Sequence, residues 1–265
     1  CGSTVYTFDT FRGMLKVIKY ADREYLAEPM KLQVWRAPMD NDRNAKNDWI
    51  KGGLKDMMQM LDSWAILENT AECFSILFKV KLAAAPHRPA VFADVTYTVK
   101  GDGVLNVRSD VKVRDTVRHL PRFGVQLAIP EDCLRMQYFG YGPMESYSDK
   151  HHAAKLGLYE TDCDANFEHY VRPQENCAHA DTRWMLVSSV AGQGLLAVTT
   201  GKDFSFNCSH FTPAQLTETA HDYELVPMKE TCVNLDMIQS GIGSNSCGPQ
   251  LEPEHRIDEK EIQFT

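Results

Sequence analysis

The sequence has no long apolar stretch, no excess of basic residues and no Cys-x-x-Cys pair, and each absence removes a class of protein. A membrane-spanning helix needs about 20 consecutive apolar residues, so we expect none. The net charge of −8 leaves no basic face for nucleic-acid phosphates. Without Cys-x-x-Cys, the common zinc-ribbon and thioredoxin signatures are missing. The first ten residues, CGSTVYTFDT, lack the basic start and apolar stretch of a signal peptide.

The eight cysteines in 265 residues are too few to mark a small disulfide-stapled domain. Several lie in apolar, strand-like segments such as ECFSILFKV and FSFNCSHF, where cysteine acts as a small hydrophobe. We therefore expect reduced, mostly buried thiols. This slightly favours the reducing cytoplasm; a periplasmic location would require a targeting signal in a longer parent protein.

The dominant pattern is an alternation of apolar and polar residues with a period of two, rich in β-branched and aromatic residues. It recurs over residues 71–83, 90–101, 103–115 and 122–130. Short glycine-containing turns separate such segments, for example Gly101-Asp102-Gly103 and Val190-Ala191-Gly192-Gln193-Gly194. The pattern predicts an all-β fold, a large antiparallel β-sandwich with one or two short helices, and a single domain over residues 1–265.

Two segments show helical spacing. Within residues 47–62, the apolar residues follow a period close to that of a helix; they are Trp49, Ile50, Leu54, Met57, Met58 and Leu61. Residues 212–225 predict a short helix more clearly, because Thr212 can cap it, Pro213 fits the first turn and Gln215 completes a capping box.

No motif in the chain matches a metal site. Asp40, Asp42 and Asn44 match the first three ligands of an EF-hand loop, but Ala45 replaces the required glycine and Lys51 the bidentate glutamate. A polar loop with Asx turns remains as the interpretation. The adjacent His151 and His152 point in different directions on a strand or a helix. We therefore predict no metal site in this chain.

Covalent catalysis and phosphate binding also lack a motif. There is no Gly-x-Ser-x-Gly elbow, and the glycines of GIGSNSCGP, residues 241–249, are not followed by a helix start. Three carboxylates in turn-like contexts, Glu145, Asp149 and Glu175, could include a hydrolytic pair. The alternative is that they anchor loops through hydrogen bonds.

Five motifs in order carry a family resemblance: VWRAPMDND (34–42), YFGYGPMESYSD (138–149), YVRPQENCAHADTRWM (170–185), FSFNCSHFTPAQLTETAHDYEL (204–225) and GIGSNSCGP (241–249). The series resembles the C-terminal β-supersandwich, or small-chain, domain of glycoside hydrolase family 2 β-galactosidases. The resemblance extends over roughly residues 10–260 and implies a galactose-mutarotase-like supersandwich fold.

The resemblance implies a division of labour within a larger enzyme. Such enzymes remove terminal non-reducing β-D-galactosyl residues by a retaining mechanism with two glutamates. In the family, these glutamates and a Mg²⁺ or Na⁺ site lie on a (β/α)8 barrel that precedes this domain. We therefore expect this chain to need no cofactor and to be inactive alone. Its expected partners are the barrel, a β-galactoside and further copies of the full-length enzyme.

The resemblance also indicates two substrate-facing loops. A tryptophan that stacks on the sugar in the family falls on Cys247 here, so contact would come from the thiol or from Asn245 and Ser246. In the second loop, Arg36 and Asp42 are expected to hold the base by charge-assisted hydrogen bonds, while Asn41 and Arg43 face the pocket. Loop anchoring without sugar contact is the alternative for these four residues.

Two other functions remain open. An autonomous carbohydrate-binding module would need exposed aromatic rings, and the candidates are Trp35, Trp49, Trp64 and Trp184. A mutarotase-like enzyme would need a histidine and a glutamate as an acid–base pair, which only His210 or His221 with Glu175 could supply.

Overall fold

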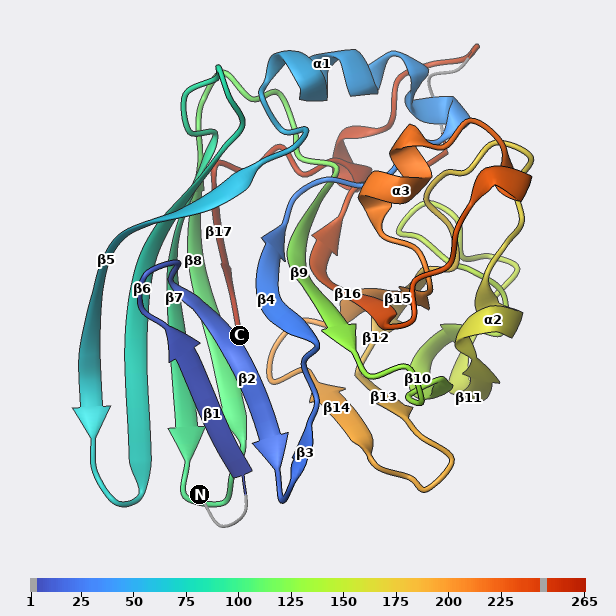
Figure 1. The fold of residues 1–265 in the computed structure, drawn as a ribbon. Coiled ribbons are helices and arrows are strands. Elements are labelled where there is room, and N and C mark those ends of the chain that lie inside the picture. Colours follow the sequence, from blue (N-terminus) through green and yellow to red (C-terminus); the bar gives the residue numbers. More distant parts are fainter. Residues whose placement is uncertain (1–3, 244–246) are drawn as a thin grey trace.

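The computed structural model describes residues 4–243 and 247–265 and shows a layered arrangement of antiparallel sheets (Figure 1). The outer sheet has the order β17-β8-β7-β6-β5 and the central sheet the order β12-β15-β16-β9-β4. A four-stranded sheet, β11-β10-β13-β14, and a small sheet, β1-β2-β3, complete the fold. The predicted all-β sandwich is confirmed. No helix in the described part of the chain is long and apolar enough to cross a membrane.

The strands have the following bounds: β1 Thr4–Asp9, β2 Met14–Tyr20, β3 Arg23–Glu24, β4 Glu28–Gln33, β5 Met58–Asn69, β6 Cys73–Ala83, β7 Val91–Lys100, β8 Leu105–Val113, β9 Arg122–Ile129, β10 Arg135–Gly142, β11 Lys155–Asp162, β12 His179–Thr182, β13 Trp184–Ser188, β14 Gly194–Val198, β15 Phe204–Ser209, β16 Thr231–Gln239 and β17 Glu261–Phe264. The predicted glycine turns join β7 to β8 and β13 to β14, and both pairs are antiparallel.

Aromatic contacts join the layers into one core. Phe8 of β1 lies 5.3 Å, centroid to centroid, from Tyr97 of β7, so the small sheet packs on the outer sheet. Phe123 of β9 contacts Phe264 of β17 at 5.4 Å, which links the outer and central sheets. Tyr138 of β10 contacts Phe206 of β15 at 5.2 Å, which links the central and four-stranded sheets. Each fully buried aromatic contributes about 1.5–3 kcal/mol of apolar burial.

The short helix predicted near residue 212 is confirmed as α3, Pro213–Glu218. The Thr212 hydroxyl accepts a hydrogen bond from the Gln215 amide, and the Gln215 side chain accepts one from the Thr212 amide. Two other α-helices are present in the described residues: α1, Ala45–Lys51, and α2, Cys163–Asn166.

The helical spacing predicted over residues 47–62 is correct only for its first part. Helix α1 ends at Lys51, and Met58 begins strand β5. Gly53 has a φ of +77°, and a Cβ there would lie 2.7 Å from the Cβ of His87. Gly52, which caps the helix, and Gly53 therefore end it, and the apolar residues that follow enter strand β5.

The prediction about cysteines is confirmed for the described residues, in which no disulfide occurs. Five thiols are buried, Cys73 is half-buried and Cys247 is exposed; the buried ones are Cys133, Cys163, Cys177, Cys208 and Cys232. Burial raises the pKa of Cys232 to about 12.

Candidate functional site

A buried arginine, Arg36, forms hydrogen bonds that connect the loop after β4 with the segment after β16. Arg36 donates to both carboxylate oxygens of Asp42, at 2.8 and 3.2 Å. It also donates to the carbonyls of Ser240 and Gly241, the latter at 3.0 Å. Its guanidinium lies 5.3 Å from the ring centroid of Trp49. The sequence predicted the hydrogen bonds between Arg36 and Asp42, and the structure shows them with both side chains buried.

Asp42 and Asn41 extend this connection. Asp42 accepts a hydrogen bond from the Met39 amide at 3.0 Å, which closes the turn that starts the 3-10 helix Asp40–Arg43. Asn41 donates from its side-chain nitrogen to the carbonyl of Ile242 at 2.8 Å. Two separate side chains of the first loop thus hold the backbone of residues 240–242.

Asp149 holds the same segment from a third direction. Its two carboxylate oxygens accept hydrogen bonds from the amides of Ile242 and Gly243, at 2.9 and 2.6 Å. A Cβ on Gly241 would lie 2.5 Å from the Asp149 Cγ, and one on Gly243 would lie 2.7 Å from Oδ2. The two glycines are therefore needed for the close approach of this carboxylate. The anion that the amides of this loop bind is therefore the Asp149 carboxylate of the protein itself.

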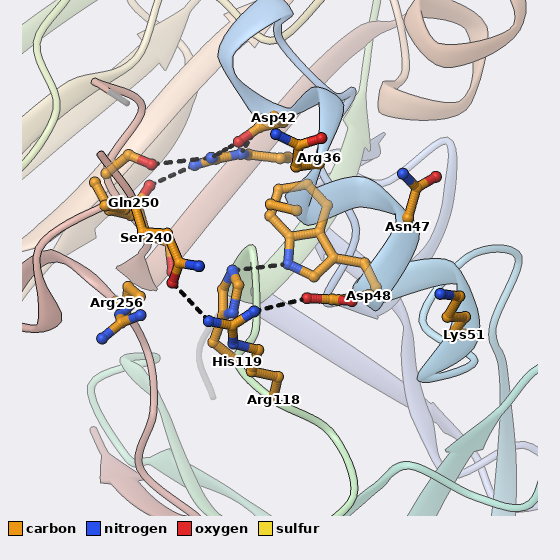
Figure 2. A pocket seen from close by; sticks show the side chains of 15 residues that line it. Arg36, Asp42, Asn47, Asp48, Lys51, Arg118, His119, Ser240, Gln250 and Arg256 are labelled. Atoms are coloured by element: carbon orange, nitrogen blue, oxygen red, sulfur yellow. Dashed lines mark hydrogen bonds and ion pairs between the residues drawn. The ribbon is translucent and has the colours of Figure 1, made fainter. Parts of the chain in front are cut away.

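A cavity of about 350 Å³ opens beside these connections (Figure 2). Arg36 and Asp42 form one wall, α1 forms a second, and Arg118, His119, Gln250 and Arg256 come from other parts of the chain. Arg118 bridges Asp48 at 3.0 Å and the Gln250 side-chain oxygen at 2.6 Å. Most of the lining residues are polar or charged, with charges of both signs, although the stems of these side chains and Trp49, Ala45 and Leu251 make much of the lining surface apolar.

His119 stands at the base of this cavity as a neutral acceptor. Its Nε2 accepts a hydrogen bond from the indole nitrogen of Trp49 at 3.0 Å, which places the proton on Nδ1. Burial lowers the pKa of His119 to about 4, partly opposed by Asp258. At neutral pH this imidazole therefore orients Trp49.

The three carboxylates singled out in the sequence are loop and core anchors. Asp149 holds the 242–243 amides, as described above. Glu145 accepts hydrogen bonds from Lys150, Tyr170 and the Cys177 amide. Glu175 is buried and forms an ion pair with Arg122. The interpretation as hydrogen-bonded anchors is the one that the structure supports.

Arg122 occupies the centre of a fully buried charge cluster. It contacts Glu175 and lies 3.4 Å from a carboxylate oxygen of Asp236. Asn207 donates a hydrogen bond of 2.7 Å to the same Glu175 oxygen. Burial raises the pKa of Asp236 to about 7, partly opposed by Arg122. The sequence offered no signal for this cluster, because its members lie on different strands and segments.

The residues predicted to contact substrate fall into two groups. Arg36, Asn41 and Asp42 lie together and face inward, whereas Arg43 and Cys247 are exposed on the neighbouring surface. Asn245 and Ser246 lie outside the described residues. For all seven residues that the sequence analysis assigned to substrate binding, contact with sugar stays a prediction. Sequence reasoning did not connect Asp149 to this site, nor Arg118 and His119 to the cavity, because nothing local links segments so far apart.

Two of the four candidate tryptophans belong to the core. Trp35 and Trp49 are buried, and their indole nitrogens bond to Thr217 and His119. Trp64 is 46% exposed on β5, and Trp184 is half-buried on β13. Only these two remain available as sugar platforms.

The proposed acid–base pair of a mutarotase is not formed. The Glu175 carboxylate is bonded to Arg122, Asn207 and Gln239. His210 contacts the Glu230 carbonyl and Asp164, and His221 contacts Glu224. Each member of the predicted pair therefore has other partners, and Glu175 is too deeply buried to meet a substrate. Within the described residues, no three His, Cys, Asp or Glu side chains are grouped so as to hold a metal ion.

A family model described as beta galactosidase small chain matches residues 2–265. This chain belongs to that family. The match includes both loops joined by Arg36, Asn41 and Asp149, and it agrees with the resemblance carried by the five sequence motifs.

Curated relatives named beta-galactosidase support the assignment. That of Staphylococcus xylosus is 36% identical over 99% of this chain and 26% of its own length. That of Actinobacillus pleuropneumoniae is 34% identical, again over 99% and 26%. That of Lactobacillus delbrueckii subsp. bulgaricus is 31% identical over 95% and 24%. The chain thus spans about a quarter of the length of these relatives. A solved structure of Aspergillus nidulans amine oxidase matches 99% of this chain and 50% of that one with 10% identity and a TM-score of 0.30, which supports no conclusion.

Proposed function

We propose that this chain is the non-catalytic, pocket-completing part of a glycoside hydrolase family 2 β-galactosidase. In this proposal, the parent enzyme hydrolyses terminal non-reducing β-D-galactosyl residues with two glutamates on a (β/α)8 barrel outside the chain. The barrel would also hold the Mg²⁺ or Na⁺. The small-chain family match and the relatives' names support the enzyme class, and the geometry of the two loops supports the division of labour.

The single observation behind the proposal is that the two loops form one preorganised unit. Arg36 and Asn41 hold residues 240–242 from one side, and Asp149 holds residues 242–243 from the other. A binding site needs its contact groups held within about 0.5 Å of their working positions. Three polar side chains, of which Arg36 is fully buried, supply that rigidity at the base of the segment that leads to Cys247.

The exposed parts of this unit are the parts that could meet a partner. Arg43 and Cys247 lie on the surface, while the connections below them are buried. A galactose unit has several hydroxyls, which polar groups on this rim can meet, and an apolar C–H face, for which an aromatic ring is the usual partner. Because the chain also lacks an assembled acid–base pair at Glu175, the rim would bind and position sugar while the barrel supplies the chemistry.

Calorimetric titration of this 265-residue chain with galactose and with lactose tests the proposal. The pocket-completing role predicts no binding tighter than about 1 mM, because the part of the pocket on the proposed barrel is missing. A nitrophenyl β-galactoside should also remain uncleaved by the chain alone and be cleaved by the full-length enzyme. Tighter binding that is lost in a Trp64→Ala variant would favour an autonomous carbohydrate-binding module and refute the proposal.

A further inference from the structure

The outer face of the β11-β10-β13-β14 sheet is apolar where a solvent-facing sheet would be polar. Leu158, Phe139, Trp184 and Val198 are consecutive cross-strand partners, so they form a continuous row over all four strands. Leu186 and Leu196 form a neighbouring pair on the same face. Leu158, Leu196 and Val198 are 67%, 62% and 58% exposed. We call these six residues the β10 face.

The alternation of burial shows that these residues point away from the core. In β10, Met136 and Tyr138 are buried against the central sheet, whereas Phe139 between strands β11 and β13 points outward. The same holds in β13, where Met185 and Val187 are buried and Trp184 and Leu186 are only half-buried. The apolar row is therefore a second hydrophobic face of a sheet whose first face is already covered.

The outer sheet provides an internal comparison within the same molecule. It lies on the opposite side of the fold (Figure 1). Its edge strand β5 has exposed apolar residues, and Phe92 of β7 is 43% exposed. Most other side chains on the solvent face of β6, β7 and β8 are charged or carry a hydroxyl; among them are Lys79, Asp94, Thr96, Arg108, Asp110 and Lys112. An antiparallel sheet with one face in water normally has this polar pattern. Exposed contiguous apolar patches, in contrast, mark interaction surfaces.

The charged residues at the border of the β10 face need no charged partner. Arg135 pairs with Glu160, and Gln137 donates to the same carboxylate at 3.3 Å. Arg183 lies over the Phe139 ring at 5.3 Å and pairs with Asp203 at 3.7 Å. The face thus offers an apolar centre with a rim that is internally neutralised, which is the composition of a permanent interface.

The β10 face is continuous with the candidate site. Strand β10 runs from this face directly into the segment that carries Asp149, and Asp149 binds the amides of Ile242 and Gly243. His151 in the same segment packs on Tyr141 of β10, with ring centroids 5.1 Å apart. A body that covers the β10 face would therefore lie next to the loop unit.

We propose that the β10 face is the docking surface for the part of the parent β-galactosidase polypeptide outside these 265 residues. This rests on the proposed function, which places the loop unit against that same polypeptide. About three quarters of each relative's length lies outside the matched segment, so ample chain exists to cover the face. The occupant is apolar at its centre and packs sheet or helix side chains on the row from Leu158 to Val198.

Thiol labelling tests this inference without measuring activity. A Leu158→Cys variant, in a Cys247→Ser background, is treated with a maleimide both as the 265-residue chain and as the full-length enzyme. Mass spectrometry of peptides then gives the labelling rate at the position. We expect labelling in the full-length enzyme to be at least about tenfold slower, because a buried thiol reacts only through local opening. Lys112→Cys on the polar outer sheet is the matched control, and Leu196→Cys is a second reporter should the first variant misfold.

The alternative outcomes are distinct. Equal rates for Leu158→Cys in the two proteins would overturn the inference. Slow labelling already in the 265-residue chain, together with a dimer in sedimentation, would assign the face to a second copy of the chain and overturn the inference. Slow labelling of the full-length enzyme that becomes fast when its subunits dissociate would do the same. Failure of the proposed function would appear as sugar binding by the chain, which this measurement does not detect.

Discussion

Replacing Asp149 with alanine should loosen the 241–249 loop while leaving the sandwich folded. The carboxylate accepts hydrogen bonds from two backbone amides, those of Ile242 and Gly243. A hydrogen bond to a charged group contributes about 1.5–3 kcal/mol when buried. Since Asp149 is half-buried and Gly243 exposed, we expect a total loss of about 2 kcal/mol for the two bonds together.

The consequence for function follows from the same number. On the proposed function, a loosened loop in the full-length enzyme would have to be ordered again when substrate binds, and this cost would be subtracted from the free energy of binding. Because 1.4 kcal/mol corresponds to a factor of ten, KM for a nitrophenyl β-galactoside should rise about tenfold, with about 30-fold as the limit for 2 kcal/mol. Steady-state kinetics measures the change in KM, and urea unfolding measures the loss of stability.

Asp162→Ala provides the matched control. Asp162 also accepts a backbone hydrogen bond, from the Ala165 amide at 2.8 Å, but it caps α2 and holds no part of the loop unit. Its replacement should cost about 1 kcal/mol of stability and leave KM unchanged. The reasoning is refuted if both variants change KM equally, or if Asp149→Ala lowers stability without any change in KM.

Two further predictions concern the buried charges. Arg36→Met should lower the free energy of unfolding by about 3–5 kcal/mol, because Asp42 is left buried without its partner, whereas Arg108→Met on the surface should cost less than about 1 kcal/mol; equal costs in urea unfolding would contradict the burial argument. For Asp236 the folded-state pKa of about 7 lies above the ordinary 3.8, so the folded protein retains a proton that the unfolded chain has lost. The stability conferred by that proton is therefore lost as pH rises from about 4 to about 7. Over this window, the free energy of unfolding of the wild type should fall by about 1.4 kcal/mol per pH unit relative to that of Asp236→Asn, which has no carboxyl to ionise. A difference that is the same at pH 4.5 and pH 7 would show that Asp236 is ionised throughout.

Features that depend on neighbouring residues could be predicted from the sequence. The alternating strands and the capping box of Thr212 and Gln215 are local patterns, and the structure contains them. The extended helix over residues 47–62 failed because Met57, Met58 and Leu61 fit either period. The helix ends at Lys51 because Gly52 caps it and Gly53 has a positive φ, beside His87, that a residue with a Cβ could not easily adopt.

The candidate site was predictable only where its partners are close in sequence. Arg36 and Asp42 are six residues apart, and their hydrogen bonds were anticipated. Asp149 and Gly243 are separated by 94 residues, so nothing local revealed that the glycines of the loop accommodate a carboxylate. The sequence of β13, WMLVS, has apolar residues on both faces of the strand. That these residues belong to an apolar face depends on the register, which places Trp184 between Phe139 and Val198.

The exposed position Cys247 allows the most direct test that the 241–249 loop reaches the substrate. The family resemblance of the sequence motifs implies a sugar-stacking tryptophan at the corresponding place, and an aromatic stack contributes about 0.5–1.5 kcal/mol. Cys247→Trp in the full-length enzyme should therefore lower KM and the inhibition constant of galactose by a factor of about two to ten. Unchanged constants in a folded variant would show that the loop does not contact the sugar.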